Sequence, residues 1–378
     1  MNKIRVGFLS SHNYFDKNSW SGILYYMYWA LRSTSIEVVD LGNPYKTNFW
    51  TKILKRISPK KSVYRVGSDE YVRDSTQFAN LVKEQLKDSK CDAIFSPVGS
   101  KELYFLDTNI PILYLSGMTH KVYKQTYSLN FTPQELDFLA RQESAAISKA
   151  TKLVYPSDWP VNSAIVDYQA EPDKIRVVPY GANLDSTPSI EDILEAKTNT
   201  SYCRLIFIGK DWERKGGEIA FQTLLALRRM KVNAELIIVG TKPPTEVQHE
   251  KLTVIPYLNK NKRSQMLKFY NLLLGSHFMI FPTKAEAFGV VSCEANAFGL
   301  PVITTEVGGI PTIIRNGKNG YMLPLSASAN QFADLIKEIF NDKSRYQMLV
   351  CSSKEEYKSR LNWNKWAESI QEIIAEMI

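Results

Sequence analysis

Short apolar runs alternate with amphipathic helical stretches along the first half of the chain. The apolar runs lack strict alternation, which is typical of strands buried on both faces of a sheet. They predict strands over residues 4–10, 36–41, 91–96, 111–116, 152–157 and 175–179. Helical patterns over residues 71–87 and 134–150 separate some of these runs. This order of strands and helices predicts a parallel α/β sheet.

The pattern breaks after Pro179. Residues 181–200 are rich in proline, serine and threonine, contain a short acidic helical piece, and are interpreted as a linker. A second series of apolar runs follows at residues 204–209, 235–240, 254–256, 278–282 and 301–304. We therefore expect two Rossmann-like, doubly wound α/β domains facing a cleft, one over residues 1–182 and one over residues 200–360. A single large α/β domain is the alternative.

Composition narrows the class of protein. The chain has 378 residues, of which 44% are hydrophobic and 23% are charged, as in globular enzymes. No apolar run reaches the roughly 18 residues that a membrane span needs. The four cysteines are far apart, so the spacing of a metal knuckle is absent and a reducing compartment is indicated. We expect a cytoplasmic protein.

A net charge of +8 points to an anionic partner, and the charge is uneven. Residues 41–68 carry seven basic side chains and no acidic one. Within them, an apolar face with helical spacing is formed by Phe49, Trp50, Ile53, Leu54 and Ile57. Residues 46–61 therefore predict a peripheral contact with the anionic inner face of a membrane. A solvated helix with Trp50 packed inward is the alternative, and a nucleic-acid partner is not expected because it would need exposed stacking aromatics.

The strongest chemical pattern lies between residues 278 and 311. A strand over residues 278–282 leads to Glu286 at its carboxyl end, where open α/β sheets bind ligands. A helix is then expected, with the amides of Phe288, Gly289 and Val290 forming an anion site at its start and Glu294 two turns into it. Amides for a diphosphate and two carboxylates for hydroxyl groups suit a nucleotide sugar. The alternative is that Glu286 is an ordinary acidic residue near a helix start and Glu294 is a surface glutamate.

Two further loops carry groups that suit phosphate. After the strand at residues 204–209, Arg214 and Lys215 place two adjacent cations before Gly216 and Gly217. Arginine offers a planar fork to phosphate oxygens, and lysine adds a point charge. In the first βα turn, Gly22 opens a helix, which by itself is a weak signal.

These motifs together resemble glycosyltransferase family four. The resemblance rests on Arg-Lys-Gly-Gly after a strand, on Glu286 and Glu294 eight residues apart around Phe-Gly, and on the later Gly-Leu-Pro-Val-Ile and Val-Gly-Gly-Ile-Pro. It implies the GT-B fold, with residues 361–378 forming a helix that crosses back to the first domain. It also implies retaining transfer from a nucleoside diphosphate sugar such as a UDP-sugar.

The resemblance assigns roles to single residues. Arg214 and Lys215 would neutralise the donor diphosphate, Glu294 would hold the ribose, and Glu286 would hold the donor sugar. Main-chain contacts to the donor would come from Phe288, Gly289, Val290 and Gly22.

The chain departs from the family pattern at two places. Pro311 is followed by Thr312 instead of the usual glutamate, and Gly117 stands where many members carry a histidine or aspartate. His120 is therefore the candidate for the catalytic helper, and His12 is a weaker one. The Asp-x-Asp metal signature of the other large transferase fold is missing, so we expect no metal and no cofactor.

The sequence thus predicts a metal-independent, hexosyltransferase-like enzyme that acts on a glycan or lipid-linked acceptor in polysaccharide or glycolipid assembly. A nucleotide-sugar epimerase or a phosphorylase of the same fold is one alternative. A non-catalytic, nucleotide-binding assembly protein is the alternative from another class.

Overall fold

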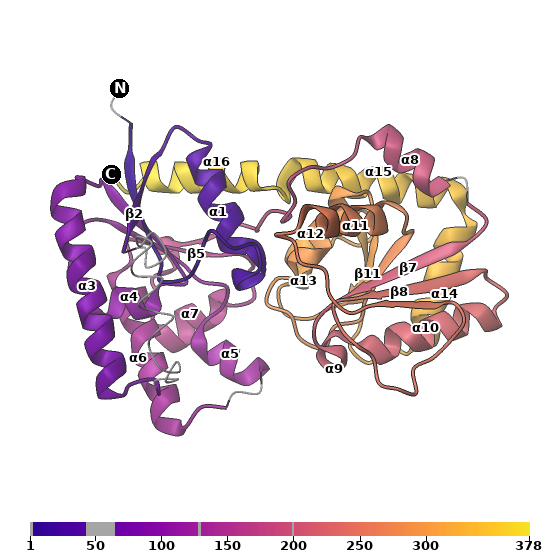
Figure 1. Cartoon of the computed structure of the whole chain (residues 1–378), viewed down its shortest axis with the longest axis horizontal. Helices are drawn as coiled ribbons and strands as arrows, with labels where there is room; N and C mark the ends of the chain where they lie inside the picture. Colours follow the sequence, from indigo (N-terminus) through magenta and orange to yellow (C-terminus); the bar gives the residue numbers. More distant parts are fainter. Residues whose placement is uncertain (1–2, 43–64, 128–129, 199) are drawn as a thin grey trace. The chain divides into compact units, whose positions relative to one another are not determined.

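The computed structural model describes residues 3–42, 65–127, 130–198 and 200–378 (Figure 1). The chain forms two compact units, one of Met1–Val178 with Ala367–Ile378 and the other of Pro179–Trp366. The basic segment 46–61, for which a membrane contact is predicted, lies outside the described residues.

The N-terminal unit is built on a parallel six-stranded sheet with the strand order β2-β1-β3-β4-β5-β6. Strands β1, β3, β4 and β5 are almost entirely buried, which is why their sequences are apolar on both faces. The strands are β1 (Arg5–Leu9), β2 (Glu37–Leu41), β3 (Ala93–Pro97), β4 (Ile112–Leu115), β5 (Lys152–Tyr155) and β6 (Ile175–Val177).

Helices connect these strands, and local sequence explains where several of them begin. In α6, Thr132 and Glu135 form a reciprocal capping box and Pro133 occupies the first turn. In α3, the Ser68 hydroxyl accepts a hydrogen bond from the backbone N–H of Tyr71. The helices are η1 (Ser19–Gly22), α1 (Ile23–Arg32), α3 (Asp69–Ser89), α4 (Ser100–Phe105), α5 (His120–Thr126), α6 (Pro133–Lys149), α7 (Val161–Tyr168) and η2 (Pro172–Lys174).

The C-terminal unit repeats this plan with a second parallel sheet, in the order β12-β11-β10-β7-β8-β9. Its strands are β7 (Cys203–Ile208), β8 (Ala234–Val239), β9 (Leu252–Ile255), β10 (Phe278–Phe281), β11 (Val302–Thr305) and β12 (Gly320–Leu323). The chain runs from β7 outward to β9 and then returns to the other side of β7 as β10. Neighbouring strands β7 and β10 therefore mark the topological switch point, where loops after the two strands diverge and leave a crevice.

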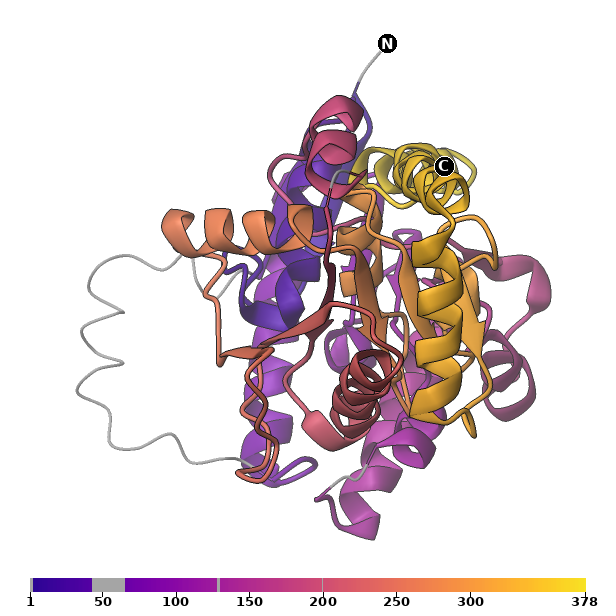
Figure 2. The ribbon, with the colours of Figure 1, turned by 90° about the vertical axis from the view of Figure 1, so that its right-hand side faces the viewer.

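Helices of the C-terminal unit pack on this sheet around one apolar core. Helices α10 and α14 lie side by side, as Figures 1 and 2 both show, and each contributes buried side chains to that core. The helices are α8 (Ile190–Thr198), α9 (Trp212–Lys215), α10 (Gly217–Arg229), α11 (Arg263–Leu274), α12 (Val290–Ala297), α13 (Ile310–Ile313), α14 (Ala329–Asn341), α15 (Lys343–Arg360) and α16 (Trp363–Ala375).

The last helix, α16, is shared between the units. Its first residues belong to the C-terminal unit, and Ala367–Ile378 belong to the N-terminal unit. There, Gln371 donates a hydrogen bond to the Ser35 hydroxyl at 2.8 Å, and Glu376 pairs with Arg176 at 3.3 Å. The predicted architecture of two Rossmann-like domains with a returning terminal helix is confirmed.

Each predicted strand is present, and β12 is the strand that the sequence did not predict. It has four residues and follows a polar turn, so its apolar run is too short to stand out. The four cysteines are free thiols, and Cys351 is only partly buried. Among the described residues, no helix combines the length and apolar composition that crossing a membrane requires.

Candidate functional site

The loop after β7 folds into a single helical turn that fixes the two predicted cations. The Asp211 side chain caps helix α9 by accepting the backbone N–H of Arg214 at 3.0 Å. Gly216 ends the turn with a φ of 75°, and a Cβ there would lie 2.0 Å from the carbonyl oxygen of Pro282. Glycine is therefore required where this loop crosses the end of β10.

Arg214 and Lys215 face the loop that follows β10, as the neighbouring positions of the two strands predict. The Lys215 ammonium donates to Glu286 Oε2, and both side chains are nearly buried, at 13% and 12% exposure. Burial lowers the pKa of Lys215, while the carboxylate of Glu286 opposes that shift. Arg214 is more exposed and donates to the Ala285 carbonyl oxygen at 3.0 Å and to Asp211 at 3.2 Å.

The position of Glu286 is set by a second glycine turn. The Gly309 N–H donates to the carbonyl oxygen of Glu286 at 3.0 Å. Gly308 has a φ of 53°, and a Cβ on it would lie only 2.0 Å from the same oxygen. The glycine pair after β11 therefore packs directly on the main chain of Glu286.

Helix α12 begins at Val290, directly after this loop. Gly289 adopts a left-handed conformation with φ 91° and is the N-cap, so no side chain caps the first amides of the helix. The Phe288 ring is buried and contacts Tyr180 at a centroid distance of 5.1 Å. Phe288, Gly289 and Val290 are thus placed to offer main-chain groups at a helix N-terminus, where an anion is favoured.

Glu294 is the fifth residue of α12, one turn from its start instead of the predicted two, because the helix begins later than expected. Its side chain is buried, which excludes the surface alternative. Lys260, in the loop between β9 and α11, donates to Glu294 Oε1 at 2.5 Å. The sequence did not predict Lys260, since it lies among several basic residues far from the Glu286–Glu294 motif.

Comparison with known proteins identifies this region. Residues 190–356 match the family described as glycosyl transferases group 1. This stretch is similar to group 1 glycosyl transferases. It contains the cation pair, both glutamates and Lys260, and the resemblance seen in the sequence is confirmed.

Relatives extend the similarity over more of the chain. The D-inositol 3-phosphate glycosyltransferase of Corynebacterium aurimucosum is 23% identical over 71% of this chain and 66% of its own length. The lipopolysaccharide glucosyltransferase WaaG of Escherichia coli is 28% identical over 50% of this chain and 53% of its own. The chain thus spans two thirds or less of the length of these relatives.

A solved structure covers both units. Anabaena HepE in complex with UDP and glucose superposes with a TM-score of 0.64 at 16% identity, covering 99% of this chain and 100% of HepE. At this identity the match shows the fold, and the predicted GT-B fold, with each unit built on a parallel sheet, is confirmed.

Two predicted site residues, Gly22 and His120, lie in the N-terminal unit, apart from the matched stretch in sequence. Gly22 has a φ of 85° and follows Trp20 and Ser21, which are also left-handed, so this turn carries backbone strain. His120 is the first residue of α5 and is half-buried. Burial lowers its pKa, and Lys124 adds to this effect, so His120 is held neutral and able to accept a proton.

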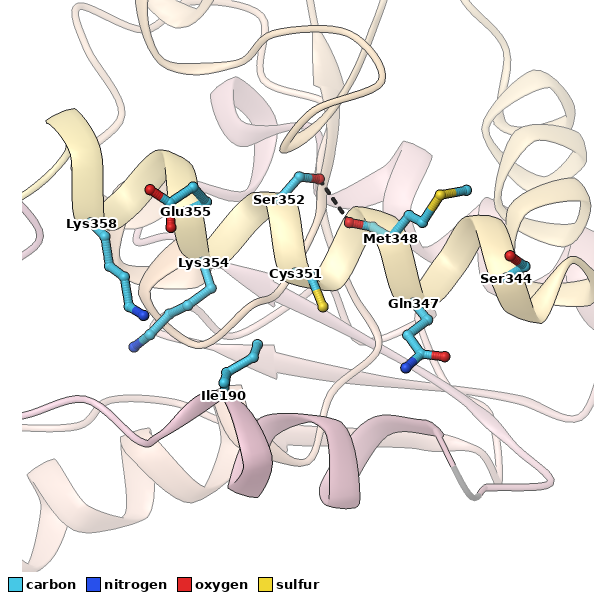
Figure 3. A pocket seen from close by; sticks show the side chains of 9 residues that line it. All are labelled: Ile190, Ser344, Gln347, Met348, Cys351, Ser352, Lys354, Glu355 and Lys358. Atoms are coloured by element: carbon cyan, nitrogen blue, oxygen red, sulfur yellow. Dashed lines mark hydrogen bonds between the residues drawn. The ribbon is translucent and has the colours of Figure 1, made fainter.

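A pocket of about 660 Å³ opens elsewhere in the C-terminal unit, between α8 and α15 (Figure 3). Ile190, Cys351 and Lys354 line it, and none of the site residues predicted from the sequence does. Within the described ranges, no three His, Cys, Asp or Glu residues are grouped as metal ligands.

Proposed function

We propose that the protein is a retaining, metal-independent glycosyltransferase that moves a hexosyl group from a nucleoside diphosphate sugar to a hydroxyl group. The observation that carries this proposal is the meeting of Lys215, Arg214 and Glu286 beside the N-terminus of α12, at the switch point within the stretch that is similar to group 1 glycosyl transferases. Cations and helix amides there suit a diphosphate, and an adjacent carboxylate suits sugar hydroxyls.

The donor we propose is a UDP-sugar. HepE, which shares the fold, has been solved with UDP and glucose. The diphosphate would lie against Lys215, Arg214 and the first amides of α12. The uridine ribose would then extend along α12 toward Glu294, and the hexose toward Glu286.

In transfer, the bond from the anomeric carbon to the diphosphate breaks and a bond to the acceptor oxygen forms. Negative charge grows on the departing diphosphate, and the fixed charges of Lys215 and Arg214 stabilise it without a metal. Glu286 Oε2 accepts from Lys215, so its other oxygen keeps acceptor positions for a sugar hydroxyl. His120, which is neutral, is the residue that we propose receives the proton of the acceptor hydroxyl.

The acceptor that we propose is a glycan or a lipid-linked sugar. WaaG is named for a reaction on lipopolysaccharide, which favours a glycan or lipid-linked acceptor here as well. A reaction on the cytoplasmic side of a membrane would follow, with residues 46–61 as the proposed contact.

Nucleotide binding and turnover test the proposal together. A thermal-shift screen over UDP-sugars should raise the melting temperature with the true donor, because ligand binding stabilises the folded state. Calorimetric titration with UDP alone should then show weakened binding in Glu294→Gln and near-normal binding in Glu286→Gln, since UDP carries the ribose but lacks the hexose.

Two results would contradict it. Equal losses of UDP affinity in both glutamate variants would refute the division between ribose and sugar. Donor binding without release of UDP in the presence of any glycan or lipid acceptor would favour the non-catalytic alternative.

A further inference from the structure

The pair formed by Glu294 and Lys260 is unusually well buried for two charged side chains. Only 3% of the Glu294 side chain and 20% of the Lys260 side chain are exposed. The ammonium lies 2.5 Å from Glu294 Oε1 and also 4.7 Å from the centre of the Phe269 ring. Lys260 is therefore the more exposed member of the pair.

Burial alone would disfavour the ionised form of the Glu294 side chain. Desolvation raises the pKa of Glu294, and the charge of Lys260 and its hydrogen bond lower it, as does the backbone N–H of Asn183. A buried carboxylate that loses its cation is strongly destabilised and tends to take up a proton instead.

Lys260 is also the charged partner of this site. Among the described residues, Tyr270 on α11 and Cys293 on α12 also interact with Glu294. Burial raises the pKa of Tyr270 to about 12 and raises that of Cys293, so both stay neutral near pH 7. Lys260 is thus the cation that opposes the effect of burial on Glu294.

The Glu294 carboxylate keeps acceptor positions that its partners do not use. A carboxylate has about four acceptor positions, of which Lys260 and the Asn183 amide use two. Two positions remain, which is the number that the 2′- and 3′-hydroxyls of a ribose need. A protonated carboxyl would offer fewer acceptors and would present a donor of its own.

We propose that Lys260 is a positioning residue for the donor, which holds the Glu294 carboxylate ionised and oriented to accept the ribose hydroxyls. This inference rests on the proposed function, in which Glu294 binds ribose. Lys260 acts through Glu294 and needs no contact with the reacting atoms.

The test measures UDP affinity by calorimetry at several values between pH 6 and pH 8. Lys260→Met removes the cation and keeps an apolar stem of similar length, so the pKa of Glu294 rises further. Affinity should then fall, relative to the wild type, by up to about tenfold for each pH unit below the new pKa. Lys260→Arg keeps the charge and should therefore show the wild-type pH profile. If Lys260 acted only through packing, Lys260→Arg would not be expected to retain that profile.

The Glu294→Gln background provides the matched control. Glutamine does not titrate, so adding Lys260→Met to Glu294→Gln should introduce no pH-dependent loss of affinity. If Lys260→Met does not fold, as thermal melting would reveal, Lys260→Gln removes the charge while keeping a hydrogen-bond donor and carries the same test.

The outcomes separate the two proposals. If Lys260→Met binds UDP as tightly as the wild type at every pH, or more tightly, the proposed role of Lys260 is overturned. The proposed function then still stands, provided that Glu294→Gln loses UDP affinity. Unchanged UDP affinity in Glu294→Gln overturns the ribose assignment and the role of Lys260 with it.

Discussion

Replacing Gly308 with alanine would place a methyl group against the main chain that carries Glu286. The new Cβ would lie 2.0 Å from the Glu286 carbonyl oxygen, whereas ordinary contacts of a Cβ begin at 3.4 Å. The two loops must therefore separate by about 1.4 Å, and the hydrogen bond from Gly309 to the same oxygen is disturbed. Because that oxygen belongs to the backbone, rotation of a flexible side chain cannot relieve the contact.

The expected cost has two parts. A left-handed φ costs an L-residue roughly 1–2 kcal/mol, and overpacking adds about 1–3 kcal/mol to the loss of stability. For the reaction, a misplacement of about 1 Å near the reacting groups costs on the order of 100-fold in rate. We expect Gly308→Ala to lower turnover by about that factor while the protein remains folded at 25 °C.

Gly317→Ala is the matched control. Gly317 also has a left-handed φ, 78°, but the nearest atom to its Cβ would be the Tyr321 hydroxyl at 3.7 Å. It therefore carries the backbone strain without the contact to the Glu286 loop. Turnover is measured as UDP released per enzyme at saturating donor, and thermal melting of both variants reports stability. Equal turnover in the two glycine variants would refute the argument that Gly308 positions Glu286.

Two other predictions address charge. Lys215→Ala should lower turnover by on the order of 100-fold or more in the same UDP-release assay, because the departing diphosphate loses its cation. Lys284→Ala removes a cation that is 60% exposed on the loop after β10, and should leave turnover within about twofold. Similar losses in both variants would contradict a specific role of Lys215. In the N-terminal unit, burial raises the pKa of Glu143 from its ordinary 4.5 to about 7, although the Tyr114 hydroxyl donates to it at 2.9 Å. The folded state thus binds the proton more tightly, so this contribution to stability is full below pH 4.5 and is lost as pH rises through 7, by about 3 kcal/mol. Glu143→Gln lacks this dependence, and the difference in melting temperature between it and the wild type should change between pH 5 and pH 8; a constant difference would show that Glu143 does not titrate in this range.

The sequence predicted the sheets well because their strands are short apolar runs separated by helices. The loops that carry Arg214, Lys215 and Glu286 follow two of these strands. The sequence alone therefore places the three residues at the edge of the sheet. The adjacency of β7 and β10 then follows from the doubly wound order, which brings the two loops together.

The details that the sequence did not predict depend on contacts between distant residues. Lys260 lies 34 residues before Glu294, and Lys262 and Arg263 close by offer the same charge, so the sequence alone could not select it. The helical turn at Arg214 does have a local signal in the sequence, since Asp211, three residues earlier, is a residue type common at the N-cap. The roles of Gly22 and His120, like those of the other site residues, stay predictions.

The division of helix α16 between the two units has a practical consequence for exchanging parts between related enzymes. Apart from Gly22, the residues proposed to bind the donor come from one stretch of chain, residues 203–313, and would transfer as a block. However, Gln371 and Glu376 contact Ser35 and Arg176, so the end of the chain belongs with the N-terminal unit. A chimaera joined only at the linker near Pro179 would combine a foreign N-terminal unit with a tail that evolved for another surface. Two junctions, one near Pro179 and one near Ala367, would keep each set of contacts together.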